Sequence, residues 1–119
     1  MKQRIALMLA AGLLGSASMA YAQDPAGSVE NGRKLYTTNT CYTCHGTVGQ
    51  GGERSAGPKI APNPFPYAAF EGQLRNPRGQ MPRYPKEFVS DKDMADIYAY
   101  VSSIKAGPAS QDIPLLKAF

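Results

Sequence analysis

The 119-residue sequence is poor in the residues on which most metal and nucleic-acid sites depend. It contains no tryptophan, one histidine and two cysteines, and charged residues make up only 18% of it. This supply of Cys and His is too small for a structural zinc site, which normally takes four such ligands. The 13 lysines and arginines are scattered, without basic runs or interleaved aromatics, so nothing favours binding of nucleic acid.

Long hydrophobic runs are also missing. The longest covers the ten residues 5–14, whereas a helix that crosses a bilayer needs about 20. Lys2 and Arg4 precede this run, and an Ala-x-Ala pattern follows it at residues 20–22. This order is typical of a secretory signal peptide that is removed. We therefore expect cleavage of residues 1–22, export to a periplasm, and no membrane span in the mature chain.

The mature chain is small and nearly neutral. Removal of 22 of the 119 residues leaves 97, enough for one domain with a modest core. Without Lys2 and Arg4, 11 basic residues remain against nine acidic ones, a net charge of +2. We expect the domain to cover residues 23–105 and a C-terminal extension to cover residues 106–119.

Both cysteines and the histidine lie together in Cys41-Tyr42-Thr43-Cys44-His45. This C-x-x-C-H pattern is typical of c-type haem attachment. Two thiols three residues apart lie on one face of a helical turn, so each can add to a vinyl group of the same porphyrin. His45 lies one turn after Cys41 and can place an imidazole nitrogen on the iron, which is a common haem ligand. We predict one covalently attached haem c, bound by Cys41, Cys44 and His45.

Other interpretations of the two thiols stay open at this point. A disulfide between Cys41 and Cys44 would suit an oxidising compartment, and thioredoxin-like redox pairs share the C-x-x-C spacing. The redox pair requires a βαβ context, however, and the surrounding sequence is rich in glycine and proline instead. The adjacent histidine and the export signal favour haem.

Two methionines of the mature chain, Met81 and Met94, are candidates for the sixth ligand of the iron. Met94 falls on the apolar face of an expected helix, where a role in the core is the better interpretation. Met81 lies in a loop beside Pro82, which stiffens the backbone. We predict His45 and Met81 as the metal ligands; a lysine, or an open five-coordinate iron, is the alternative. A Met/His iron has a raised potential and suits electron transfer.

Apolar spacing and capping residues predict three helices around this motif, within residues 28–38, 65–74 and 90–107. Residues 46–64 contain many glycines and prolines, so we expect a loop without regular structure that wraps around the haem. The tail at residues 109–119 ends on apolar side chains and is expected to pack over the domain. Docking of this tail on a partner is the alternative.

The order of these motifs resembles that of class I cytochromes c, the small bacterial monohaem type. The resemblance covers residues 28–104 and implies an all-α cytochrome c fold, with three to four short helices wrapped around one covalently attached haem. It also implies that the first and last helices cross, that the Pro58 carbonyl accepts the His45 ring N–H, and that the Met81 sulfur binds the iron. The motifs that carry it are Gly32-x-x-x-Tyr36, Cys41-x-x-Cys44-His45, Gly57-Pro58, Met81-Pro82 and Asp96-Ile97-Tyr98-Ala99-Tyr100-Val101.

The expected function is that of a soluble periplasmic one-electron carrier, not an enzyme by itself, with redox proteins as electron donor and acceptor. The alternative is a dedicated electron-accepting cytochrome c subunit of a periplasmic dehydrogenase complex, whose catalytic subunit would be the partner. An iron with an open position would instead suit a haem-based gas sensor or a peroxidase. Unmodified Cys41 and Cys44 would suit a thiol oxidoreductase.

Overall fold

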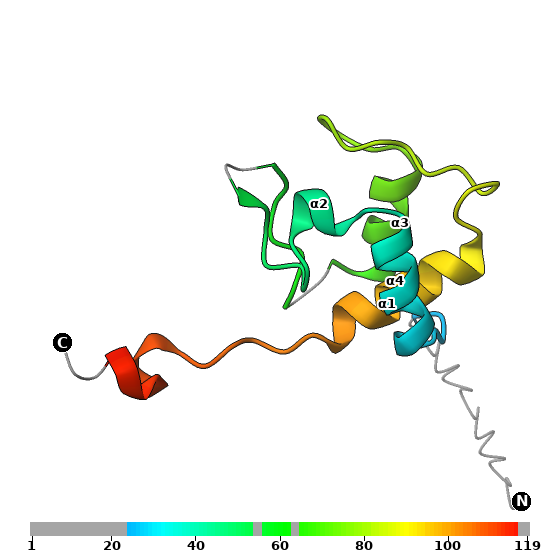
Figure 1. Cartoon of the computed structure of the whole chain (residues 1–119). Helices are drawn as coiled ribbons and strands as arrows, with labels where there is room; N and C mark the ends of the chain where they lie inside the picture. Colours follow the sequence, from blue (N-terminus) through cyan, green and yellow to red (C-terminus); the bar gives the residue numbers. More distant parts are fainter. Residues whose placement is uncertain (1–23, 54–55, 63–64, 117–119) are drawn as a thin grey trace, which may run out of the picture.

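The computed structural model describes residues 24–53, 56–62 and 65–116 (Figure 1). No strand occurs among these residues, which confirms the predicted all-α class. No helix in the described ranges combines the length and apolarity needed to cross a bilayer. The expected signal peptide, residues 1–22, lies outside the described residues. The elements are α1 (Val29–Thr38), α2 (Tyr42–His45), α3 (Tyr67–Arg75), α4 (Asp91–Ser103) and the 3-10 helices η2 (Ser110–Asp112) and η3 (Pro114–Leu116).

Serine residues fix the starts of α1 and α4. The Ser28 hydroxyl accepts the backbone N–H of Asn31 at 3.2 Å. The Ser90 hydroxyl accepts the N–H of Asp93 at 3.1 Å, and the Asp93 carboxylate accepts the N–H of Ser90 at 3.3 Å. This reciprocal capping box satisfies donors that a helix start otherwise leaves free. Both starts agree with the sequence-based prediction.

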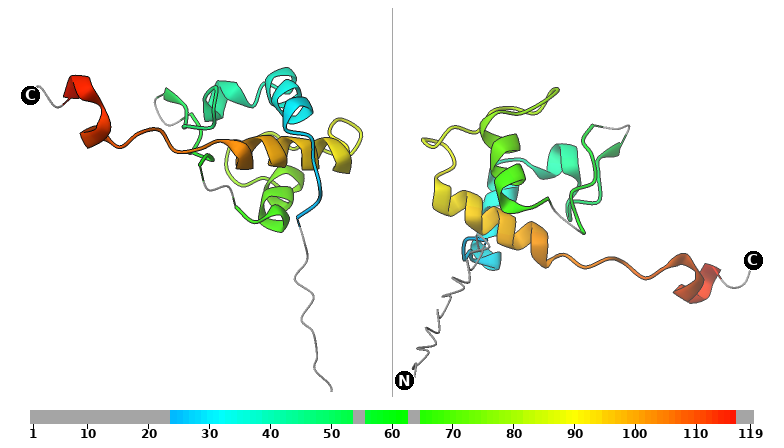
Figure 2. Two further views of the ribbon diagram at one scale, coloured as in Figure 1. Left: turned by 90° about the horizontal axis from the view of Figure 1, so that it is seen from below. Right: turned by 180° about the vertical axis from the view of Figure 1, so that it is seen from behind.

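Helices α1 and α4 cross, as the ribbon views show (Figure 2), and Gly32 lies where α1 meets α4. A Cβ atom on Gly32 would overlap the Asp96 carbonyl oxygen and would lie 2.8 Å from the Tyr100 Cβ. The missing side chain therefore lets the two backbones come together. One turn further along α1, the ring of Tyr36 packs edge-on against that of Tyr100, with centroids 5.4 Å apart. The predicted crossing is confirmed.

The hydrophobic core lies mainly between α4 and the helices α1 and α3. Met94 has no exposed surface, in agreement with its predicted core role. The core residues that are at least nine-tenths buried are Tyr36, Ala61, Phe70, Leu74, Val89, Met94, Ala95, Ile97, Tyr98, Tyr100 and Val101.

Asp96 of α4 is the buried charged residue of the described core, with no exposed surface. Its carboxylate accepts the Lys92 ammonium at 2.8 Å, the Ser28 backbone N–H at 2.7 Å and the Asn31 side-chain amide at 2.8 Å. These bonds, the one from Lys92 first, lower the pKa of Asp96 from 3.8 to about 2, although burial acts in the opposite direction. The carboxylate thus ties the start of α1 to α4.

Two expectations for the C-terminal part are wrong over the described residues, which end at Leu116; residues 117–119 of the tail lie outside them. Helix α4 ends at Ser103 rather than near Gly107, and Ile104 already has extended backbone angles (φ −75°, ψ 121°). Residues 105–112 are all exposed and lead away from the helices instead of packing over them (Figures 1 and 2). The physical reason is that the apolar face of α4 ends with the half-buried Ile104, so further turns would have nothing to pack against.

Candidate functional site

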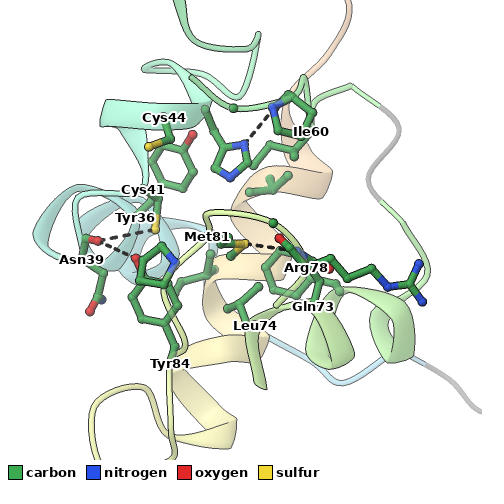
Figure 3. Close-up of a pocket in the computed structure, with 18 of the residues that line it drawn as sticks. Tyr36, Asn39, Cys41, Cys44, Ile60, Gln73, Leu74, Arg78, Met81 and Tyr84 are labelled. Atoms are coloured by element: carbon green, nitrogen blue, oxygen red, sulfur yellow. Dashed lines mark hydrogen bonds between the residues drawn. The ribbon is translucent and has the colours of Figure 1, made fainter. Parts of the chain in front are cut away.

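A cavity of about 1120 Å³ lies beside α2, bounded by α3, residues 56–60 and residues 76–84 (Figure 3). This volume slightly exceeds that of most small-molecule sites, which is usually about 300–1,000 Å³. All four residues predicted to bind the cofactor line this cavity. They are Cys41, Cys44, His45 and Met81.

Cys41 precedes the short helix α2 as its N-cap residue and Cys44 lies within the helix; the two are not joined by a disulfide. Cys41 is half-buried and Cys44 is exposed. The backbone N–H groups of Cys44 and His45 both donate to the Cys41 carbonyl, at 3.3 Å and 3.0 Å, which forms the helical turn that the spacing predicted. Both thiols therefore lie on the segment that borders the cavity.

The environment of Cys41 does not suit a thiol oxidoreductase. Burial raises the pKa of the Cys41 thiol to about 11, so this thiol is protonated at neutral pH. Redox-active dithiols need a lowered pKa instead, because the thiolate is the nucleophile.

In the described part of the chain, no group of three or more His, Cys, Asp or Glu side chains is arranged to hold a metal ion.

The ring of His45 is oriented by the loop that follows α2. Its Nδ1 lies 2.8 Å from the Pro58 carbonyl oxygen. A carbonyl only accepts hydrogen bonds, so Nδ1 carries the proton and Nε2 is left with a free lone pair for a metal. Added Cβ atoms on Gly52 or Gly57 would overlap the Cys44 carbonyl oxygen. These two glycines therefore allow the loop to bring Pro58 against α2, and the contact implied by the resemblance is present.

Two tyrosines from the helix crossing hold the chain just after His45. The Tyr36 hydroxyl donates to the Gly46 carbonyl at 2.7 Å, and the Tyr100 hydroxyl donates to the Thr47 carbonyl at 3.3 Å. Burial raises the pKa of Tyr36, so its hydroxyl remains a donor across the physiological range. Tyr36 belongs to a motif that carries the family resemblance, but the sequence gave no sign of this hydrogen bond.

Met81 lies half-buried on the connection between α3 and α4. The ends of this connection are anchored by Arg75. Its guanidinium donates to the carbonyls of Tyr84 at 2.8 Å and Val89 at 2.7 Å, and it forms an ion pair with Asp91 at 2.8 Å. The connection thus leaves α3 and returns to α4 at fixed points, with Met81 between them at the cavity.

Gln73 of α3 is the polar neighbour of the Met81 sulfur (Figure 3). Its side-chain nitrogen lies 3.6 Å from Met81 Sδ and 3.5 Å from the Arg78 carbonyl oxygen. Sequence reasoning missed Gln73, because a single glutamine on a helix carries no signal of the loop residue that it will meet.

Comparison with known families decides which proteins this chain resembles. Residues 27–101, more than half of the chain, match the model of the family described as cytochrome C oxidase, cbb3-type, subunit III. The chain belongs to this family of c-type cytochromes. The family predicted from the motifs is therefore confirmed, and membership implies haem c as the cofactor.

Two relatives of this cytochrome carry curated names. The first is the 4-cresol dehydrogenase [hydroxylating] cytochrome c subunit of Pseudomonas putida, 32% identical over 105 residues that cover 88% of this chain and 84% of that protein. The second is the cytochrome bc1 complex cytochrome c subunit of Corynebacterium diphtheriae, 35% identical over 89 residues that cover 72% of this chain but only 30% of that protein. No solved structure matches the chain. Electron transfer fits both names.

The residues around the cavity of this cytochrome fit a haem c group. Two thiols, an imidazole with a free Nε2 and a thioether sulfur border the same space. The apolar positions that predicted a helix over residues 65–74 also line it, although Phe65 lies before α3 rather than within it. A large apolar ring would cover these side chains, which are Phe65, Ala69, Phe70 and Leu74.

Proposed function

We propose that this cytochrome is a soluble periplasmic one-electron carrier with one haem c, attached through Cys41 and Cys44 and ligated by His45 and Met81. The observation that supports this most strongly is that all four side chains line one cavity of sufficient volume. When bound, haem c supplies a one-electron couple between ferric and ferrous iron.

The role of the chain would be to hold both protein ligands of the iron and leave no position for a substrate. The Pro58 carbonyl fixes the His45 ring so that Nε2 is the ligating nitrogen. The Met81 thioether is the second ligand and favours a raised potential. With both positions occupied by His45 and Met81, the group would exchange electrons without bond formation to the metal. This arrangement favours a carrier over a gas sensor or a peroxidase.

The mass of the exported protein tests attachment and processing together. We expect the denatured, purified chain to have the mass of residues 23–119 plus one haem, and to be recovered from the periplasmic fraction. The variants Cys41→Ser and Cys44→Ser each lack one thiol, so we expect each of them to hold the haem through a single thioether bond. A wild-type mass equal to that of the bare polypeptide would overturn the proposal.

The sixth ligand is tested by two methionine variants. The ferric protein should have the weak long-wavelength absorption band of an iron–thioether bond, and the reduced protein should not bind carbon monoxide at neutral pH. Met81→Ala should abolish the band and permit carbon monoxide binding, whereas Met94→Ala should keep the band. Loss of the band in Met94→Ala alone would show that the ligand is assigned to the wrong methionine.

A second candidate function is that of an electron-accepting subunit of a dehydrogenase complex. The Pseudomonas relative favours this function, because its name describes such a subunit and the match covers 84% of its length. Gel filtration of the native protein from its source separates the two functions. A free carrier elutes at the mass of a single cytochrome, whereas a subunit elutes together with a larger redox protein.

A further inference from the structure

We propose that Gln73 is the positioning residue for the sixth ligand: its side-chain amide holds the Met81 thioether on the iron and prevents small ligands from replacing it. This inference rests on the proposed ligation by Met81. It adds a residue to which neither the sequence motifs nor the resemblance assigns a role.

The contacts of Gln73 define which end of its amide faces the loop. The side-chain nitrogen is 3.6 Å from Met81 Sδ and 3.5 Å from the Arg78 carbonyl oxygen. Both partners can only accept hydrogen bonds, and an amide NH₂ group has two protons to donate. The NH₂ end must therefore face the loop, one N–H directed to each acceptor.

These two bonds matter because the loop has little else to hold it. Within the described residues, no other hydrogen bond is made to residues 77–83. The next one along the chain joins the Tyr84 N–H to the Leu74 carbonyl at 2.9 Å. Gln73 itself stands on α3, next to the buried Leu74, so the donor is fixed by a packed helix. A ligand on a loop is thus held by a donor on a rigid element, which is the arrangement that keeps a site in place.

The sulfur can take part in both interactions at once. A thioether sulfur is a weak acceptor with two lone pairs, so one can accept the Gln73 N–H while the other faces the cavity that Met81 lines. Loss of the N–H would free the side chain of Met81 to rotate away from the cavity. A competing ligand would then bind more easily, by about threefold to tenfold if one ordinary hydrogen bond is lost.

The test is a titration of the ferric holoprotein with imidazole. Loss of the iron–thioether absorption band measures how much imidazole has bound. Gln73→Leu removes the donor, and Gln73→Glu replaces it at neutral pH with a carboxylate of similar length that has no proton to donate. Both variants should bind imidazole about threefold to tenfold more tightly than the wild type. The matched control is Gln80→Leu, because Gln80 also lines the cavity but makes no hydrogen bond within the described residues. The control should keep the wild-type affinity.

The possible outcomes separate this inference from the proposed function. Wild-type imidazole affinity in both Gln73 variants, or an equal increase in Gln80→Leu, would overturn the role of Gln73 alone. A lower melting temperature of the Gln73 variants without any change in affinity would also overturn it, since a purely structural contact has that effect. If the wild type lacks the band and Met81→Ala leaves imidazole binding unchanged, both proposals fail.

Discussion

Two regions of the molecule are held together in different ways. At the α1–α4 crossing, backbones approach at Gly32 and a buried carboxylate, Asp96, accepts three hydrogen bonds. Around the cavity, short segments are fixed by hydrogen bonds to individual carbonyls, such as those of Gly46 and Pro58. At the crossing, the two helices contact each other directly. On the cavity side, apolar side chains surround an open space instead.

The difference indicates how stability and function are divided in this cytochrome. The crossing supplies a fixed frame, and its tyrosines Tyr36 and Tyr100 extend that frame to the chain beside His45. The cavity side positions the predicted ligands and is expected to gain its stability from the bound cofactor. Substitutions at the crossing should therefore act on unfolding, whereas those at the cavity should act on ligand binding.

The largest effect is expected for Gly32→Val. The new Cβ would overlap the Asp96 carbonyl oxygen, which belongs to the backbone and cannot move aside. Forcing the helices apart should lower the free energy of unfolding by about 3 kcal/mol. Urea unfolding of the holoprotein measures this change. Gly107→Ala is the control, because a Cβ there meets no atom within 4 Å; a similar loss in both variants would contradict the importance of the crossing.

Asp96→Asn should have the next largest effect, and it should depend on pH. The folded-state pKa of Asp96 is lowered from 3.8 to about 2, so the unfolded chain binds the proton first as the pH falls. The carboxylate therefore stabilises the fold fully above about pH 4, by about 2 kcal/mol, and loses this contribution between about pH 4 and pH 2.

The measurement is the difference in unfolding free energy between wild type and Asp96→Asn as a function of pH. This difference should be largest near neutral pH and should shrink as the pH falls toward 2. Asp112→Asn is the control, since Asp112 is exposed on η2, and its profile should coincide with that of the wild type. A difference between wild type and Asp96→Asn that does not vary with pH would contradict the assigned hydrogen bonds.

A smaller effect is expected for Tyr36→Phe, which tests the link between the two regions. The variant keeps the ring packed on Tyr100 but removes the hydroxyl that donates to the Gly46 carbonyl at 2.7 Å. The loss should be about 1 kcal/mol in urea unfolding. Tyr42→Phe is the matched control, because the side chain of Tyr42 is exposed and donates no hydrogen bond within the described residues. Equal stability of Tyr36→Phe and wild type would mean that the crossing does not support the cavity side.

Features that depend on short spacing could be predicted from the sequence. The caps at Ser28 and Ser90, and the turn that brings the two thiols together, each involve residues within a few positions of each other. The cysteines, His45 and Met81 could be selected because few residues of their kinds exist in the chain.

Contacts between distant segments could not be predicted from short spacing; the α1–α4 crossing and the Pro58–His45 contact were expected from the family resemblance. Asp96 reads as one of several acidic residues near a helix start, yet its partner Ser28 is 68 positions away. Likewise, Gln73 acquires its contact with Met81 only after the loop has folded back on α3. Local patterns hold no information about which atoms of distant segments will meet.

The C-terminal extension is where sequence and structure disagree, and its removal should have the smallest effect. The apolar residues of the tail led us to expect packing over the domain, but packing also needs a complementary surface. In the structure Leu115 and Leu116 are 80% and 52% exposed, and residues 105–112 make no buried contact. Truncation after Lys105 should therefore change the unfolding free energy of the holoprotein by less than about 0.5 kcal/mol. A loss above about 1 kcal/mol would mean that the tail packs on the helices after all, since burying even one leucine contributes more than that.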